Sequence, residues 1–450
     1  MSSETGLHRA IWAIALPSML TNVATALFGL ADLWVIGRLG DAEAQGGVEI
    51  GAKFMMGLLV VFNFLRAGTI ALTAQASGRG DADAQAATLA RALGAALLIG
   101  LMLLAFKPLL MPLGLDLLHA RGGVAADAQT YVGIRYWSGL LWLTNAVLIG
   151  WLIGRRQVRA VLAVEVGANI LHIALDIAFV LGLGWGVAGV AVATVLSEGA
   201  KTVALALLVG RQPAAQAALA AASHRATWSR SQLAILFRLN RDLFIRTLLL
   251  TASILALTRA GAHQGPLVLA ANGIIYQLFI LSALILDGFE SAAQVLCGEA
   301  AGARDRARFD RLVRTLLLWG LAGGAVISLT YAVAGDHFAA SFSTSPEVVE
   351  TVLLYTVWAL ILPIAGVTSY IFDGVYIGVT WTRGLMLTMA AASACYLLLL
   401  FALQPLGNHG LWLAFTLFML ARAGGQALLL PRLRRRTFPA DRPRRLDPLS

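Results

Sequence analysis

Long apolar stretches, separated by short polar connections, make up nearly the whole chain. A helix needs about 20 apolar residues to cross a bilayer, and twelve of the stretches are long enough. They fall near residues 11–37, 51–77, 88–112, 130–153, 160–183, 186–209, 235–261, 267–298, 309–335, 347–377, 384–405 and 409–430. The pattern predicts an all-α integral membrane protein with twelve transmembrane helices.

The amino-acid composition also indicates that lipid surrounds most of the chain. Of the 450 residues, 59% are hydrophobic and 13% are charged, and the mean hydropathy is +0.77. Soluble domains carry about 25% charged residues, which this chain does not approach. Its two cysteines, Cys297 and Cys395, lie in apolar runs without the spacing of a metal site. Neither a disulfide framework nor a metal centre is expected.

The net charge of +10 arises from basic residues in alternate connections between the apolar runs. They include Arg79 and Arg91, Arg155 to Arg159, Arg225 to Arg241, Arg304 to Arg314, and Arg432 to Arg445. Connections rich in Lys and Arg face the cytoplasm. We therefore expect a multi-pass protein of the bacterial cytoplasmic membrane, with both termini in the cytoplasm. The charge then marks topology and contact with membrane lipids, so neither a nucleic acid nor an obligate protein partner is expected.

A polar segment rich in Ala and Ser divides the chain into two halves. We expect an N-terminal six-helix lobe over 1–210, a cytoplasmic linker over 211–234, a C-terminal six-helix lobe over 235–432 and a basic cytoplasmic tail over 433–450. Six pairs of glycines recur at an offset of 224, among them Gly78 and Gly302; chance gives about two. Two pseudo-symmetric bundles of equal orientation are typical of transporters that rock about a central site.

Ionisable residues inside the apolar runs mark candidate sites, because a carboxylate at the bilayer centre costs about 3 kcal/mol. Asp32 lies in the first run, on a stripe with Asn22 and Thr25. Asp176 lies in the fifth, where His172 and Asn169 share its helical face, and Thr194 lies at similar depth in the sixth. Two nearby carboxylates could bind and release a coupling proton. His172 is either a proton relay or a hydrogen-bond donor, and hydrogen-bonded packing is the alternative for the aspartates.

A second acidic set lies in the C-terminal half. Asp287 and Glu290 share a face of the eighth run, and Asp373 lies in the tenth near Tyr370. We expect these residues to line a cavity that attracts a cationic substrate. Arg66 in the second run requires an anionic partner in the membrane, either an aspartate of the first half or another structural ion pair. It is also a candidate residue of the substrate cavity.

The chain contains no Walker sequence, HExxH or GxSxG motif, so neither ATP hydrolysis nor another enzymatic activity is expected. It resembles instead the multidrug and toxic compound extrusion (MATE) family, in its DinF-type branch. The resemblance runs nearly from end to end. The segments that carry it include IALPSMLTN…GLADLWVIGRLG at 14–40, FLRAGTIALTAQASG at 64–78, GWLIGRRQVRA at 150–160, NILHIALDIAFVLGLGWGVAGVAVATV at 169–195, ALILDGFESAAQVLCGEAAGARD at 283–305 and FDGVYIG at 372–378.

The resemblance implies a twelve-helix, two-lobed antiporter that exports organic compounds by using a proton or sodium gradient. In related members the aspartates of the first and fifth spans are implicated in cation coupling; Asp32 and Asp176 match them, and Thr194 matches a polar residue of that site. His172 stands where related sequences usually have Asn. Asp373 resembles one half of an acidic pair in another branch, but the seventh span has no central Glu, which favours protons over sodium.

We therefore predict a proton-coupled antiporter, with sodium as the alternative ion, that exports amphipathic and cationic small molecules. H⁺ or Na⁺ serves as coupling ion, and no other cofactor is expected. A flippase for a lipid-linked precursor is the alternative, for which Arg66 alone offers support. A membrane sensor or scaffold without transport is a third reading, because the linker and the basic tail could bind partners.

Overall fold

The computed structural model describes residues 2–343 and 345–439, so the last residues of the expected basic tail lie outside the described chain. The first half contains α1 (Ser2–Gly37), α2 (Ala42–Val60), η1 (Val61–Asn63), α3 (Phe64–Arg79), α4 (Ala82–Leu117), α5 (Gly122–Arg135), α6 (Ser138–Gly154), α7 (Val158–Asp176), the π-helical η2 (Ile177–Gly182) and α8 (Gly186–Gly210). α9 (Pro213–Ser223) and η3 (Arg225–Trp228) follow. The second half contains α10 (Arg230–Ala262), α11 (Pro266–Gly302), α12 (Arg306–Phe342), α13 (Pro346–Gly378), α14 (Thr382–Ala402), η4 (Gln404–Leu406) and α15 (Gly407–Thr437).

The helices confirm the predicted all-α membrane fold. Among the described residues, 11 helical stretches are long and apolar enough to cross a membrane, and the pair α5 and α6, bent by 50°, forms a twelfth. One of the 11 runs through α2, η1 and α3. The segment expected as a linker contains α9 and η3, and α10 begins before the apolar run it carries.

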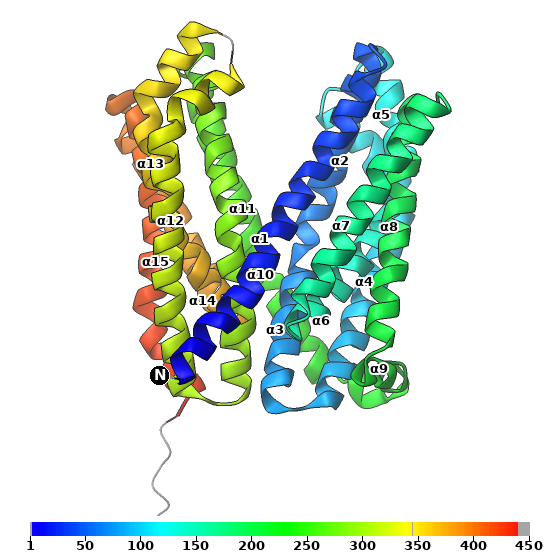
Figure 1. Ribbon diagram of the computed structural model, residues 1–450, viewed down its shortest axis with the longest axis vertical. Helices are drawn as coiled ribbons and strands as arrows, with labels where there is room; N and C mark the ends of the chain where they lie inside the picture. The colour runs from blue at the N-terminus through cyan, green and yellow to red at the C-terminus, as the bar shows by residue number, and fades with distance from the viewer. Residues whose placement is uncertain (1, 344, 440–450) are drawn as a thin grey trace, which may run out of the picture.

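The helices form two lobes (Figure 1), one built from the first half of the chain and one from α10 to α15. The lobes come together at the end where the N-terminus lies and diverge toward the other end (Figure 1). We call these the closed face and the open face. At the closed face Gln75 donates to the carbonyl of Gly378 at 2.8 Å, and Arg156 forms an ion pair with Glu299.

Helix α1 connects the lobes, because its two halves pack on different partners (Figure 1). In the N-terminal half, Trp12 makes edge contacts with Phe289 of α11 and Trp319 of α12. In the C-terminal half, Asp32 contacts His172 of α7. The helix that carries Asp32 in one lobe therefore also packs on the opposite lobe.

The two halves repeat each other in detail. Asp81 accepts the N–H of Ala84 at the start of α4, and Asp305 accepts that of Arg308 at the start of α12, both at 2.8 Å. Residues in these caps are 224 apart, the offset found in the sequence. The same offset separates paired glycines at which helices approach closely, such as Gly78 and Gly302. This confirms the predicted repeat.

Candidate functional site

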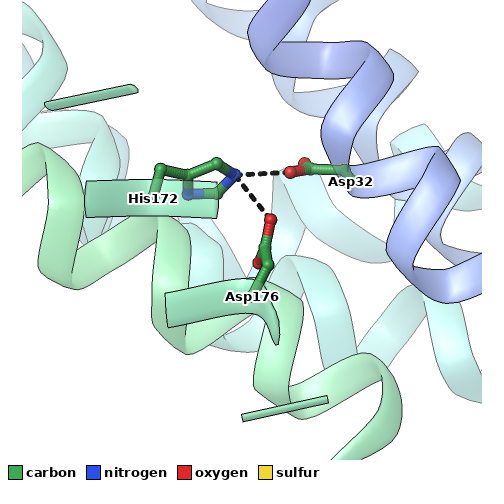
Figure 2. Close-up of side chains that lie close together, drawn as sticks. All are labelled: Asp32, His172 and Asp176. Atoms are coloured by element: carbon green, nitrogen blue, oxygen red, sulfur yellow. Dashed lines mark hydrogen bonds and ion pairs between the residues drawn. The ribbon is translucent and has the colours of Figure 1, made fainter. Parts of the chain in front are cut away.

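Three buried side chains from two helices meet in the N-terminal lobe (Figure 2). The Nε2 atom of His172 lies 2.5 Å from Oδ1 of Asp32 and 3.0 Å from Oδ2 of Asp176. The ligand-type atoms of all three residues lie within 4.8 Å of one another, a grouping that could also hold a metal ion. The predicted proximity of the two aspartates is confirmed, and His172 is placed between them.

Local helix geometry explains half of this cluster. His172 and Asp176 are four residues apart, so α7 presents them on one face. Asp176 is the last residue of α7 and is followed directly by the π-helical η2. Single π-helical turns are rare and frequently occur at functional sites.

The geometry has a direct consequence for protons. One Nε2 atom faces two carboxylates, and it carries at most one N–H. It can give a full hydrogen bond to one carboxylate at a time, so the second needs either a share of that N–H or a proton of its own. One Nε2 atom therefore serves both carboxylates, and Asp32, His172 and Asp176 form one interacting unit.

A second layer of polar residues surrounds this unit. Ser197 lies with its Oγ 3.3 Å from Nδ1 of His172 and donates to the carbonyl of Thr194 at 3.0 Å. Tyr131 donates to Asp32 at 3.4 Å and accepts from Arg135. The hydroxyl of Thr194 itself donates to Val190, so Thr194 reaches the cluster through Ser197.

Asn169 holds α7 against α1. Its side-chain amide donates to the carbonyl of Ala24 at 2.9 Å, and Ala24 directly precedes Thr25 of the stripe on which Asp32 lies. Tyr131, Arg135 and Ser197 were not among the predicted site residues. The available signal was Arg135, a charged residue inside the apolar run 130–153.

A cavity of about 590 Å³ lies against this cluster in the N-terminal lobe. Asp32, Asn169 and Thr194 line it, whereas His172 and Asp176 lie behind Asp32 and are fully buried. A proton or cation that enters the cavity therefore meets Asp32 before the other two residues.

Further charges in this cavity wall are paired with each other. Lys201 forms ion pairs with Glu198 at 2.9 Å and with Glu165 at 3.2 Å. Lys201 thus pairs with Glu198 of its own helix, and Glu165 joins this pair from α7. All three side chains have an ionic partner, and two glutamates against one lysine leave an excess negative charge in this wall.

A second cavity, of about 380 Å³, lies in the C-terminal lobe. Four of the five expected substrate-cavity residues line it, namely Asp287, Glu290, Tyr370 and Arg66. Arg246 and Arg422 line it as well, although the sequence analysis did not select them. The wall thus carries both signs of charge, and two of its three arginines were not among the expected residues.

The expectation that Asp373 lines this cavity is wrong. Its side chain is fully buried and holds Arg422 at 2.6 Å, Gln426 at 2.6 Å and Arg246. A carboxylate that already binds two guanidinium groups has little attraction left for a cationic ligand. In the seventh span, Arg246 is the charged residue that pairs with Asp373. A charged residue inside an apolar helix is costly, and this feature of the sequence could have identified Arg246.

Arg66 lacks the ion pair that the sequence led us to expect. Within the described residues it has no carboxylate within ion-pair distance and no hydrogen-bond partner for its side chain. It lines both cavities, as does Asn63, and therefore lies where the two cavities meet.

The fold and the two cavities define a two-lobed, multi-pass membrane transporter. The chain belongs to the MatE family, whose family model matches residues 17–178 and again residues 243–404. Members of this multidrug and toxic compound extrusion family are efflux transporters and not enzymes, and this chain is one of them.

Relatives support this assignment over the whole chain. DNA damage-inducible protein F of Escherichia coli is 35% identical over 422 residues, which is 94% of this chain and 92% of that protein. A probable multidrug resistance protein NorM of Bradyrhizobium diazoefficiens is 28% identical, with 94% and 93% covered. A crystal structure of a MATE protein in the bent conformation has the same fold, with a TM-score of 0.85 at 18% identity and 96% of each chain covered.

Proposed function

We propose that this protein is a proton-coupled antiporter that exports amphipathic, cationic organic compounds across the bacterial cytoplasmic membrane. The observation that carries the proposal is the position of His172, whose Nε2 atom lies between Asp32 and Asp176 (Figure 2). A unit of two carboxylates and one imidazole takes up and releases protons without leaving an isolated charge in the lipid.

Coupling requires that protons change the free energy of one lobe arrangement relative to another. Asp32 borders the cavity and is carried by α1, which also packs on α11 and α12 of the other lobe. Protonation of the unit weakens the attraction between Asp32 and His172 and so alters how α1 packs on α7. Substrate leaves toward the open face in this state, and release of the protons restores the state that accepts new substrate.

The orientation in the membrane is part of the proposal. The basic residues Arg79 and Arg304 lie at the ends of α3 and α11, next to Gly78 and Gly302, at which the two lobes are in contact. Because such residues remain in the cytoplasm, the closed face and both termini are placed there and the open face outside. The surrounding lipids contact the exposed apolar surface of the helices.

Protons are proposed over sodium because an imidazole already occupies the place between the carboxylates where a cation would bind. Asn169 and Thr194 complete the proposed coupling site, since they line the same cavity wall as Asp32. The flippase alternative gains no support from the named relatives, which are called damage-inducible and multidrug resistance proteins.

The test is dissipation of a preset pH gradient in proteoliposomes when an organic cation is added. We expect wild type to release protons on substrate addition, with or without sodium, and Asp32→Asn and Asp176→Asn to lose the response. Asp83→Asn, an exposed carboxylate in the first turn of α4, is the matched control and retains it. If both aspartate variants keep full gradient-driven transport, the proposed coupling site is wrong. A response that requires sodium moves the coupling ion to Na⁺.

A further inference from the structure

A groove runs along the outside of the N-terminal lobe between α7 and α8, which pack side by side (Figure 1). We call it the α7–α8 groove. Its volume is about 660 Å³, and ligand sites usually have about 300–1,000 Å³. Ala163 and Leu171 in its wall are exposed, so the groove faces the surrounding lipid.

Small side chains create this groove. The residues from α7 recur every three or four positions and form one helical face; they are Ala160, Ala163, Val164, Gly167, Ala168 and Leu171. A Cβ built on Gly167 meets no atom within 4 Å. Atoms beside an empty hollow lose van der Waals contacts, so such a groove in a membrane is filled by an acyl chain or by another helix.

The groove is about as long as one leaflet of the bilayer is thick. From Ala160 to Leu171 the helix rises by about 16 Å. Half of the hydrocarbon core measures about 15 Å. One acyl chain therefore fits along α7 from the membrane surface to the midplane.

The end of the groove at Arg211 carries positive charge without a carboxylate partner. Gln212 donates to Gln157 at 3.4 Å, so the end of α8 lies beside the start of α7. Arg211 and Arg159 flank this junction and are exposed. Within the described chain, neither arginine side chain has an ion pair or a hydrogen bond. Both guanidinium groups are free to bind an anion.

The opposite end of the groove is different. Lys201 lines it, ten residues before Arg211 on α8, but its ammonium group is held by Glu198 at 2.9 Å and by Glu165 at 3.2 Å. The lysine therefore offers the groove its aliphatic stem and not a free charge. An anionic group is attracted to one end only, which gives a bound amphiphile a single orientation.

We propose that the α7–α8 groove binds an anionic phospholipid of the cytoplasmic leaflet. The phosphate pairs with Arg211 and Arg159, and one acyl chain lies along α7 between Ala160 and Leu171. Basic pockets between transmembrane helices on the cytoplasmic side bind anionic lipid head groups. The inference goes beyond the proposed export and takes from it only the orientation in the membrane.

Charge favours a lipid over a second copy of the chain in this groove. A two-fold axis along the membrane normal places the same surface of both copies at the same depth. Arg211 and Arg159 of one copy would then lie opposite the same arginines of the other, and like charges repel. A phosphate is complementary to them.

Native mass spectrometry of the detergent-purified protein tests the inference with two lipids that share their acyl chains. Phosphatidylglycerol is anionic, whereas phosphatidylcholine is zwitterionic. We expect wild type to bind phosphatidylglycerol about tenfold more tightly. Replacing both Arg159→Gln and Arg211→Gln removes this preference. Arg432→Gln with Arg435→Gln is the control, because these exposed arginines end α15 in the other lobe, and it keeps the preference.

A second pair of variants tests the position of the acyl chain. Gly167→Phe places a ring in the groove, and we expect phosphatidylglycerol to bind at least about tenfold more weakly. Gly424→Phe, in α15 of the other lobe, is matched because a Cβ there also meets no atom within 4 Å. It should bind the lipid as wild type does. Thermal unfolding confirms that each variant is folded.

The outcomes are distinct. Wild type that binds both lipids equally, or binds neither, overturns the inference. A preference that persists in the folded double arginine variant overturns the assignment of the phosphate, and unchanged binding in Gly167→Phe overturns that of the chain. A dimer present in wild type and lost in Gly167→Phe would make the groove an interface between copies instead. Because binding is measured without a gradient, failure of proton-coupled export with lipid binding intact contradicts only the proposed function.

Discussion

Gly78 of α3 and Gly302 of α11 form a reciprocal contact between the two lobes. A Cβ at Gly78 would lie 2.1 Å from the carbonyl oxygen of Glu299, and a Cβ at Gly302 would lie 2.1 Å from that of Gln75. Both pairs obey the offset of 224, so the repeat places one glycine of each lobe against the backbone of the other. The lobes can approach this closely only because both positions lack a side chain.

The first prediction concerns this contact. Gly78→Ala cannot be accommodated by a side-chain rotation, because the clash is with backbone, so we expect the closed face to open. Overpacking of this kind shifts the population of the closed arrangement by about tenfold. Spin labels at Arg79→Cys and Arg304→Cys, in protein with Cys297→Ala and Cys395→Ser, report the change as longer distances.

Gly424→Ala is the control for this measurement. Gly424 lies inside α15, and a Cβ there meets no atom within 4 Å. In the Gly424→Ala variant, the distribution of distances between the two spin labels should match that of wild type. An unchanged distribution in Gly78→Ala would mean that the glycine contact does not determine how closely the lobes approach.

The ion pair between Arg156 and Glu299 provides a second prediction. Nε of Arg156 donates to Glu299 at 2.5 Å across the lobes, and Arg308 donates to the same carboxylate at 3.1 Å. The Arg156 side chain is 41% exposed, so screening limits the pair to about 1 kcal/mol. We expect Arg156→Gln to open the closed face more often, by about fivefold.

The rate of maleimide labelling at Ala74→Cys measures this opening. Ala74 is fully buried between the lobes, beside Gly298 of α11. Lys53→Gln removes an exposed ion pair within α2 and should leave the rate unchanged. Equal labelling rates in Arg156→Gln and wild type would show that the pair is not a lock on the closed face.

The third prediction separates the roles of His172 and the two aspartates. An asparagine in place of His172 removes the imidazole that lies between the carboxylates and cannot carry a proton between them. We expect His172→Asn to exchange fewer protons per substrate and to gain a dependence on sodium, since two carboxylates remain without a positive neighbour. Proton release and substrate flux are measured together in the same proteoliposomes.

The exposed His263 is the matched control, and His263→Asn should retain the wild-type ratio of protons to substrate. A ratio that is also unchanged in His172→Asn would assign His172 a structural role. Loss of transport in all conditions would point instead to a requirement for the imidazole in folding or in substrate release, and thermal unfolding distinguishes the two.

A fourth prediction concerns stability in the C-terminal lobe. Asn272 and Asn408 exchange two hydrogen bonds of 2.8 Å, and Trp412 donates to Asn272 at 2.8 Å. All three side chains are buried, so Asn272→Ala leaves polar groups of both partners unsatisfied. We expect a loss of about 2 kcal/mol and a lower midpoint of thermal unfolding. Thr416→Ala, which removes one hydrogen bond within a helix, should shift the midpoint much less.

Much of the coupling site was predictable because its signals are local. The cost of a buried carboxylate singled out Asp32 and Asp176, and helical spacing placed His172 on the same face as Asp176. Tyr131 and Ser197 were not predictable in the same way. A tyrosine and a serine cost little inside a membrane helix, so only their contacts with Asp32 and His172 reveal them.

The amino-acid sequence by itself determined the number of spans, the two repeated halves and the family, because each depends on patterns along one helix or on similarity along the chain. Tertiary structure alone decided which charges are paired. Asp373 is neutralised by Arg246 and Arg422 from two other helices, whereas Arg66 is left without a partner. Helix pairing depends on where glycines allow close approach, as at Gly78, and this sets which distant charges meet.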